Sequence, residues 1–466
     1  MNLNSYKYIY FLGIGGIGMS ALARYFNSRG KQIFGYDKHK SDLCQKLEEE
    51  GMQIIYTDKK KYLPNFIVNA KKNQVLVIYT PAISNDNILL NFFLLKKVNI
   101  YKRAEILGLI SKDIYTIAIA GTHGKTTTST MLAHILKHNK RDIMAFLGGI
   151  SSNYNTNFLV SKNIDLMIVE ADEFDKSFLN LYPDIAIITS ISPDHLDIYD
   201  DENDLFLAFH QFASQVKNKG LLLIENSINY IFPTPVKGLQ ISYSAENKNA
   251  DLYIDYVEQK NNRFFFKIES NKINCNPFDI HTNLIGTDMP GIHNISNAFS
   301  ASLVASYLGL SEFEINNAFS SFKGINRRFQ KYIDNDKYVY IDDYAHHPNE
   351  VRATIRAVKD TYPQRKLTVV FQPHLYSRTR DFAKDFADSL ISADQLILLD
   401  IYAAREAPIK GITSKTLFKL CNNDNKTLCS KKNLLSFLQQ SNLDVLLTLG
   451  AGDIGGLARP IKRILD

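Results

Sequence analysis

Short apolar runs rich in β-branched residues recur along the chain, separated by segments of helical periodicity. The runs at residues 8–12 and 116–120 each lead into a glycine turn and then into a helical pattern, while those at 185–188 and 367–371 lead into polar clusters. Continuous apolar runs are typical of buried parallel strands, and alternation of strand and helix is typical of a doubly wound sheet. The pattern predicts an α/β protein.

A chain of 466 residues is too long for one hydrophobic core, and breaks in the pattern indicate three domains. We place them at residues 1–112, 113–323 and 324–466. The first is expected to be Rossmann-like. The second combines a parallel sheet around a phosphate-binding turn with a small β region at about residues 232–285, where short strands alternate. The third begins at a hinge near residue 324.

The composition is that of an ordinary globular protein and argues against several other classes. Apolar residues make up 45% and charged residues 22%, and the formal net charge is only +6. We assign lysine clusters such as 59–61 to solvated surface, because they are not interleaved with aromatics as a nucleic-acid site would be. The four cysteines form no CxxC pair. The start lacks the pattern of a signal peptide, and no apolar run is long enough to span a membrane. We expect a cytoplasmic protein without nucleic-acid or membrane partners.

The stretch at 116–136 has the design of a phosphate cradle. A buried strand ends at the turn Gly121, Thr122, His123, Gly124, and a helix then opens with Lys125, Thr126 and Thr127. Backbone N–H groups at such a turn point at an anion, the lysine adds positive charge, and the first threonine hydroxyl can ligate Mg²⁺. A complete P-loop has a glycine where Ile119 stands, so the loop is a shortened variant. We predict ATP binding.

A second glycine turn opens the first domain. Gly13, Gly15, Gly16 and Gly18 lie between a strand and a helix, and Asp37 ends the next strand. This is a dinucleotide fingerprint, in which glycines admit a pyrophosphate and the acidic residue accepts from a ribose or base. Taken alone it suggests NAD or FAD, but beside an ATP loop the pyrophosphate can belong to a UDP-sugar. Ser84 lies in a predicted binding loop that belongs to the same site.

Further polar residues follow strands of the central domain. Glu170 ends the strand at 164–169 and is the expected Mg²⁺ ligand, and His195 follows the next strand in a loop at the same edge. A solvent-facing loop histidine is an equally plausible reading of His195. Asn294 and Asn297 lie near a helix that we place at 295–308; an asparagine can read adenine, although Asn294 can equally be a helix N-cap. His134 and His138 lack a third ligand, so we place them on a polar helix face.

Polar clusters also follow four strands of the third domain, where a doubly wound sheet places its ligands. Together the motifs GIGGIGMS, AGTHGKTTT, EADE, SPDHLD, GIHNISNA, NRRF, DDYAHHP, QPHLYSRTR and GAGDI closely resemble those of the Mur ligases of bacterial peptidoglycan synthesis. The resemblance covers essentially the whole chain in order. It implies a UDP-sugar domain, an ATPase core and a Rossmann-like C-terminal domain that brings the amino acid.

The resemblance also implies a reaction and roles for residues. The lactyl carboxylate of UDP-N-acetylmuramate attacks the γ-phosphate of ATP, and the amine of L-alanine attacks the resulting acyl phosphate. Lys125 binds phosphates, Thr126 and Glu170 hold one Mg²⁺, and His195 ligates a second. His293, Asn294 and Asn297 lie beside adenine, and Arg327 and Arg378 approach the phosphates or the acyl intermediate. The amino-acid and carboxylate end is formed by Tyr344, His346, His374, Arg378 and Arg380. A monomer or a weak homodimer is expected.

Three departures concern the fine detail of the site. Phe209, His210 and Gln211 stand where later ligases of the family have a carbamylated lysine. Leu375 stands where the family often has a basic residue, and Arg405 replaces a usual glycine. Three alternative functions stay open. The first is an NAD-dependent oxidoreductase, which gives no function to the ATP loop, and the second is a P-loop ATPase that hydrolyses ATP without joining two substrates. The third is the sister ligase that attaches a recycled tripeptide to the same UDP-sugar.

Overall fold

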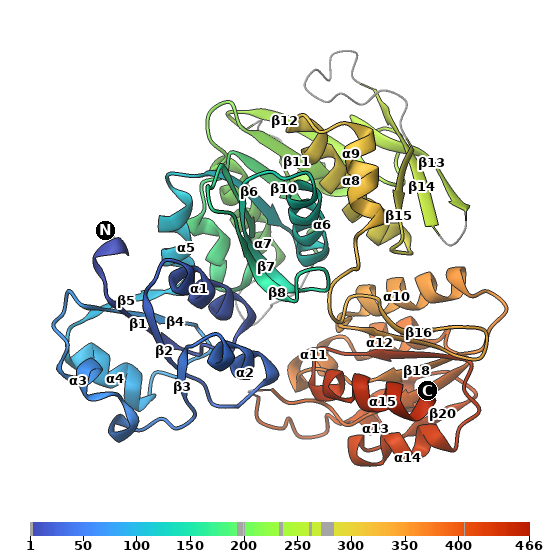
Figure 1. Cartoon of the computed structure of the whole chain (residues 1–466). Coiled ribbons are helices and arrows are strands. Elements are labelled where there is room, and N and C mark those ends of the chain that lie inside the picture. Colours follow the sequence, from blue (N-terminus) through green and yellow to red (C-terminus); the bar gives the residue numbers. More distant parts are fainter. Residues whose placement is uncertain are drawn as a thin grey trace. The chain divides into compact units, whose positions relative to one another are not determined.

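The computed structural model describes residues 3–192, 199, 201–232, 236–260, 263–271, 284–404 and 406–466. Its strands form three sheets (Figure 1). The chain divides into two compact units. One comprises Met1–Asp255, Lys267–Ile285 and Asn297–Ser321, and the other comprises Tyr256–Phe266, Gly286–Ser296 and Phe322–Asp466. The predicted α/β class with three sheet-containing regions is confirmed.

The N-terminal sheet has the order β3-β2-β1-β4-β5 with every described pair parallel. Side chains of β1 alternate between its two faces. Ile9 and Phe11 join a core that continues into the central domain, whereas Tyr10 and Leu12 join a separate core under α3 and α4. The elements are η1 Leu3–Ser5, β1 Tyr8–Leu12, α1 Ile17–Ser28, β2 Gln32–Tyr36, α2 Asp42–Glu49, β3 Gln53–Ile55, η2 Lys60–Tyr62, α3 Asn65–Asn69, β4 Val75–Tyr79, α4 Ile88–Leu95, β5 Asn99–Lys102 and α5 Arg103–Ser111.

The central sheet has the order β15-β14-β13-β12-β11-β10-β6-β9-β7-β8. Its β6 lies between β10 and β9, parallel to both, so the turn after β6 opens at the middle of the sheet edge. The elements are β6 Tyr115–Ala120, α6 Lys125–His138, β7 Ile143–Ser151, β8 Thr156–Val160, β9 Leu166–Glu170, η3 Phe174–Asn180, β10 Ile185–Ile188, α7 Glu202–Ser214, β11 Leu221–Glu225, η4 Asn226–Ile231, β12 Leu239–Ser244, β13 Leu252–Lys260, β14 Arg263–Ser270, β15 Leu284–Thr287, α8 Ile292–Tyr307 and α9 Glu312–Ser320.

The C-terminal sheet has the order β16-β17-β21-β18-β19-β20, parallel except for its edge strand β16. The elements are β16 Gln330–Asp334, β17 Val339–Asp343, α10 Pro348–Thr361, β18 Leu367–Phe371, α11 Tyr376–Asp381, α12 Ala383–Leu390, β19 Gln395–Leu398, α13 Ser414–Leu420, β20 Lys426–Leu428, η5 Lys431–Asn433, α14 Leu434–Gln439, β21 Val445–Leu449, η6 Asp453–Leu457 and α15 Ala458–Leu465. Among the described residues, no helix has the length and apolarity needed to cross a membrane.

Two local predictions were wrong. Helix α8 begins at Ile292, so Asn294 lies in its first turn instead of capping it. The earlier start follows from Gly291, whose φ of +91° turns the chain into the helix. His134 is buried, with a relative exposure of 3%, because the end of α9 covers it. Its ring nitrogens contact Tyr154 and the Ala318 carbonyl, and burial lowers its pKa to about 4.

Candidate functional site

The turn between β6 and α6 depends on two glycines in the left-handed region. Gly121 has φ +133° and Gly124 has φ +86°. A Cβ on Gly121 would lie 2.1 Å from the Thr189 hydroxyl oxygen, and one on Gly124 would lie 2.4 Å from the Asn297 side-chain oxygen. Helix α6 then starts at Lys125 without a side-chain cap from the described residues. First-turn N–H groups of a helix have no acceptor within the helix, and such groups are typical donors to a bound anion.

The loop after β10 holds this turn in place. The Thr122 and His123 amides donate to the carbonyl and hydroxyl of Ser190, at 2.9 Å each. The Ser192 amide donates to the Thr122 hydroxyl at 3.0 Å, and the Ser192 hydroxyl contacts the His123 ring at 3.1 Å. These contacts occupy the Thr122 and His123 amides, so those two groups are not available to an anion.

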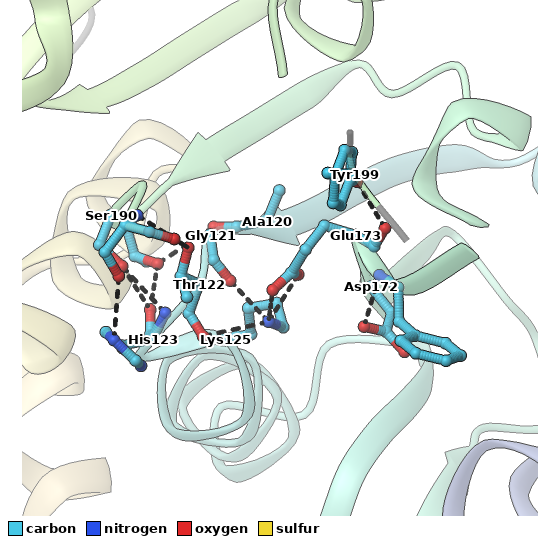
Figure 2. A network of polar contacts seen from close by, with 12 residues as sticks. Ala120, Gly121, Thr122, His123, Lys125, Asp172, Glu173, Ser190 and Tyr199 are labelled. Carbon is cyan, nitrogen blue, oxygen red and sulfur yellow. Dashed lines mark hydrogen bonds and ion pairs between the residues drawn. The ribbon is translucent and has the colours of Figure 1, made fainter. Parts of the chain in front are cut away.

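Lys125 is held by a buried carboxylate that we did not assign from the sequence. Its ammonium donates to both carboxylate oxygens of Glu173, at 2.7 and 3.0 Å, and to the Gly121 carbonyl at 2.6 Å (Figure 2). Glu173 is only 1% exposed, and the Tyr199 hydroxyl donates to its backbone carbonyl at 2.7 Å. Lys125 is thus held beside the turn by Glu173, which lies three residues after the end of β9.

Three acidic residues lie at the end of β9 or just after it: Glu170, Asp172 and Glu173. Burial alone lowers the pKa of Lys125, but Glu173, Asp172 and Glu170 outweigh it, and the pKa is raised above its ordinary value. A Cβ on Gly148 of β7 would lie 1.9 Å from a Glu170 carboxylate oxygen, so the glycine makes room for that carboxylate. Carboxylates beside a phosphate cradle are hard oxygen donors of the kind that Mg²⁺ prefers. Among the described residues, however, no three acidic, histidine or cysteine side chains form a group that could hold a metal ion.

One cavity joins this acidic edge to the first glycine turn. It has a volume of about 220 Å³, and its lining includes Gly16, Gly18, Gly148 and Glu170. Arg103, at the start of α5, also lines it, and its guanidinium lies 3.9 Å from the Asp172 carboxylate. The residues that the sequence assigned to a sugar nucleotide and to a metal therefore face the same space.

The first glycine turn is contacted by other residues of the N-terminal domain. A Cβ on Gly13, where φ is +84°, would lie 2.5 Å from a Thr80 methyl carbon. The Gly15 amide donates to the Asp37 carboxylate at 2.8 Å, and the His39 amide donates to the other carboxylate oxygen at 3.2 Å. Asp37, predicted to accept from a ribose or base, is thus engaged in shaping the turn. Ser84 is exposed, and its hydroxyl donates to Asp86.

Of the residues predicted beside adenine, Asn297 contacts the cradle directly. Its side-chain oxygen accepts from the Thr128 hydroxyl at 3.2 Å, and its exposed fraction is 7%. The side-chain amide of Asn294 instead donates to the Pro290 carbonyl at 2.8 Å in the turn before α8. His293 lies in the same first helical turn. Thr126 and Thr127 are buried at the start of α6.

The second unit brings four predicted residues together. The rings of Tyr344 and His346 are 5.3 Å apart, and those of His346 and His374 are 5.9 Å apart. The Arg378 guanidinium is 3.5 Å from His374 Nδ1 and is almost completely buried. His346 Nδ1 lies 3.2 Å from the Glu350 carboxylate. The carboxyl ends of β17 and β18 therefore form one cationic and aromatic cluster.

The two remaining predicted arginines have partners within their own unit. Arg327 donates to the Asp342 carboxylate at 3.1 Å and to the carbonyls of Gly450 and Gly452. Arg380 is exposed and pairs with Asp381 at 2.6 Å. Their assigned roles in binding ATP and the amino acid stay predictions.

His195 and Arg405 lie outside the described residues. Sequence reasoning missed Arg103, Gly148 and the contacts of the loop at 189–192. It placed Asp172 and Glu173 at the nucleotide-facing edge of the sheet but gave neither a specific role. Glu173 lies in the EADE motif that we noted, yet the motif does not say which of its acids meets Lys125. Which acid contacts Lys125 is decided by the conformation of the turn after β9.

Three protein-family models match successive parts of the chain. Residues 8–115 match the model "Mur ligase family, catalytic domain", residues 119–305 the "Mur ligase middle domain" and residues 327–452 the "Mur ligase, glutamate ligase domain". The UDP-N-acetylmuramate–L-alanine ligase of Cytophaga hutchinsonii is 44% identical over 469 residues, covering 100% of this chain and 98% of that protein. The ligase of the same name from Porphyromonas gingivalis is 43% identical, with 99% of each chain covered.

Solved structures show the same similarity. The crystal structure of UDP-N-acetylmuramate-alanine ligase from Thermotoga maritima matches with a TM-score of 0.81 at 26% identity, covering 98% of both chains. A murein peptide ligase from Psychrobacter arcticus matches with a TM-score of 0.71 at 22% identity, again over 98% of each chain. The second similarity extends to the fold alone.

Proposed function

The chain belongs to the Mur ligase family, and from that premise we propose that it joins L-alanine to the lactyl carboxylate of UDP-N-acetylmuramate at the expense of ATP. The observation that carries the proposal is the cavity shared by Gly16 and Gly18 of the first glycine turn and by Glu170 and Gly148 of the central domain. It supports a single site in which a sugar nucleotide from one domain meets the acidic edge beside the phosphate cradle. The full-length relatives at 43–44% identity support the acceptor.

The proposed reaction has two steps. A carboxylate oxygen of the lactyl group bonds to the γ-phosphorus of ATP, and the bond from phosphorus to the ADP oxygen breaks. The L-alanine nitrogen then bonds to the acyl carbon, inorganic phosphate leaves, and the nitrogen loses a proton. Lys125 and the first-turn amides of α6 stabilise negative charge on the transferring phosphoryl group, which is the main source of catalysis in such transfers.

Magnesium is part of the proposal. Thr126 and Glu170 would hold one ion and His195 a second. A bound cation there neutralises phosphate charge. Gly148 lets the Glu170 carboxylate approach the backbone of β7, and the Lys125 ammonium is bonded to Glu173.

The C-terminal cluster is proposed to orient the amino acid. Arg378 is buried and presents a planar fork that suits a carboxylate. His374 and His346 lie beside this fork, where they could contact the amine of an amino acid whose carboxylate the fork binds. A pocket around a methyl group distinguishes substrates by roughly 1–3 kcal/mol per methylene. L-Alanine should therefore be the best acceptor, with glycine and L-serine used less well.

The test is a competition assay with purified protein, ATP, Mg²⁺ and UDP-N-acetylmuramate, offered L-alanine, glycine, L-serine and the tripeptide together. Products are identified by mass spectrometry, and ATP turnover is measured with each component left out. We expect the L-alanyl product to dominate and ADP release to require the UDP-sugar. Preference for the tripeptide would reassign the chain to the recycling ligase. ADP release without any joined product would indicate a P-loop ATPase.

A further inference from the structure

One face of the N-terminal domain is both apolar and basic. It is formed by η2 with the preceding Lys59, by α3 and α4, and by the residues that directly follow α3 and α4, on the side of the sheet that carries the second, separate core (Figure 1). We call it the basic apolar face. The Lys96 ammonium donates to the carbonyls of Ile67, at 3.0 Å, and Val68, and so ties the end of α4 to α3. Lys60 of η2 lies 4.9 Å above the Phe92 ring of α4.

Helix α4 has no polar side. Its sequence, ILLNFFLL, contains one polar residue, and the face turned to the core already buries Leu89, Leu90 and Phe93. On the outer side Leu95 is 84% exposed, and Leu94 and Ile88 are each 53% exposed. A surface helix normally turns charged or polar residues outward. The exposed Tyr62 of η2 and Phe66 of α3 extend this apolar surface.

The same segment carries the net charge of the protein. Residues 57–102 contain eight lysines and two aspartates, without arginine or glutamate, a formal charge of +6 that equals the net charge of the entire chain. Seven of the eight lysines lie on the basic apolar face: Lys59, Lys60, Lys61, Lys71, Lys72, Lys96 and Lys97. All other charges of the protein therefore balance, and the excess is concentrated here.

These lysines are not neutralised within the described part of the chain, where no carboxylate forms an ion pair with any of the seven. The nearest acid in sequence, Asp58, accepts from the Ile88 and Leu89 amides at the start of α4, at 2.9 and 3.0 Å. Burial and the neighbouring Lys60 lower the pKa of Lys96. The cations repel one another and present an unmatched positive potential beside exposed leucines.

We propose, contrary to the expectation from the sequence that the protein has no membrane partner, that the basic apolar face binds the surface of an anionic lipid bilayer. Exposed aliphatic side chains enter the interface between headgroups and acyl chains, and the surrounding lysines attract the anionic headgroups. The face has no arginine, the cation enriched at protein interfaces. Its most exposed apolar side chains are aliphatic, whereas single-stranded nucleic acids stack on aromatics. A bilayer is the partner that uses both features. This inference is independent of the ligase assignment.

The test is sedimentation of the full-length protein with vesicles. One preparation is phosphatidylcholine alone and the other contains 30% phosphatidylglycerol, each at about 0.1 M and about 1 M NaCl, where the Debye length falls from about 10 Å to about 3 Å. We expect binding to the anionic vesicles at the lower salt only. Each lysine near the surface contributes about a fivefold change in affinity. The variant Lys59→Glu/Lys60→Glu/Lys61→Glu should therefore lose at least about 100-fold, and Leu94→Ser/Leu95→Ser about tenfold or more.

Matched controls come from elsewhere on the surface. Lys410→Glu/Lys415→Glu/Lys419→Glu makes the same change of charge at exposed lysines in and before α13. Phe313→Ser/Leu420→Ser removes two apolar side chains that are 73% and 50% exposed. Both controls should bind vesicles like the parent, and all four variants should keep the parental thermal melt and ligation rate.

Three results would overturn the proposal. The first is no binding to anionic vesicles at the lower salt. The second is equal loss of binding in the control variants, which would show a non-specific effect of net charge. The third is binding to heparin or polyglutamate through the same lysines without any vesicle binding, which would assign the face to an acidic macromolecule.

Discussion

The two glycine turns of the first unit differ in how well the sequence motif of each one predicts its contacts in the structure. The turn at Gly13–Gly18 matches the dinucleotide fingerprint in full, while the turn at Gly121–Gly124 lacks one glycine of the P-loop pattern. In the structure the first turn directs the Gly15 amide onto Asp37, and the Gly13 and Ile14 amides onto the Tyr36 carbonyl. The second turn places a buried, ion-paired lysine at the start of an uncapped helix.

The difference shows that a glycine pattern specifies backbone shape more reliably than it specifies a ligand. In the first turn, glycines are needed because Thr80 and Arg103 approach the backbone. In the second, they permit positive φ and close contact with Thr189 and Asn297. What each turn binds is set by the charges around it, and those come from residues distant in sequence.

The largest effect is expected from removing the lysine of the second turn. Lys125→Met should reduce ligation by about 1000-fold or more, because the charge on the transferring phosphoryl group loses its cation. It also leaves the Glu173 carboxylate buried without its lysine, which costs about 3–5 kcal/mol of stability. Product formation and denaturant unfolding measure the two effects separately.

The double variant Lys125→Met/Glu173→Gln is the control for this prediction. It should regain most of the lost stability while remaining inactive, since the buried charge is gone but the cation is still missing. A double variant as unstable as Lys125→Met would contradict the role given to Glu173.

A smaller loss is expected where the cavity meets the acidic edge. Gly148→Ala pushes the Glu170 carboxylate from its position, and we expect ligation to fall about 100-fold and the Mg²⁺ concentration for half-maximal rate to rise. The melting temperature should change little, because a flexible side-chain end is displaced. Gly456→Ala, where no atom lies within 4 Å of the added carbon, is the control. An unaltered Mg²⁺ titration in the folded Gly148 variant would remove Glu170 from the ligands.

The first turn can be tested by two substitutions of Asp37. Asp37→Ala removes the acceptor of the Gly15 amide and should raise the KM for UDP-N-acetylmuramate about tenfold, without changing the KM for ATP. Asp37→Asn keeps an acceptor oxygen for that amide and should have a much smaller effect. Equal losses in both variants would favour direct contact between the Asp37 carboxylate and the nucleotide. Tight NADH binding, measured by calorimetry, would revive the oxidoreductase reading.

The smallest effect concerns the helix that carries the second turn. His134 anchors α6 to α9 in its neutral form, with a pKa lowered from 6.5 to about 4, chiefly by burial. Its contribution to stability is complete above pH 6.5 and is lost as the pH falls from there toward 4. Between pH 7 and pH 5 the parent should lose roughly 2 kcal/mol more stability than His134→Gln.

His138→Gln is the matched control, because His138 is exposed on the same helix. It should keep the parental dependence on pH in denaturant unfolding. If His134→Gln behaves in the same way, the buried histidine does not titrate in this range.

Much of the fold could be predicted from the sequence because its signals are local. Continuous apolar runs identified β1, β6, β10 and β18, and the glycine turns located the two helix starts. Local signals failed at His134, where the pattern indicated a polar face. The covering residues, Ala318 and Ser321, lie about 180 positions later in the chain.

The sequence by itself determined the class of fold, the position of the glycine turn before Lys125 and the family, because these depend on periodicity and on short motifs. Only the tertiary structure decided which acid meets Lys125, that Asp37 closes its own turn, and that Gly148 makes room for Glu170. It also showed that the lysines of residues 57–102 share a face with exposed leucines. The physical reason is common to all four. A charge is defined by its residue type, but its pKa, its partner and its exposure depend on what the rest of the chain places around it.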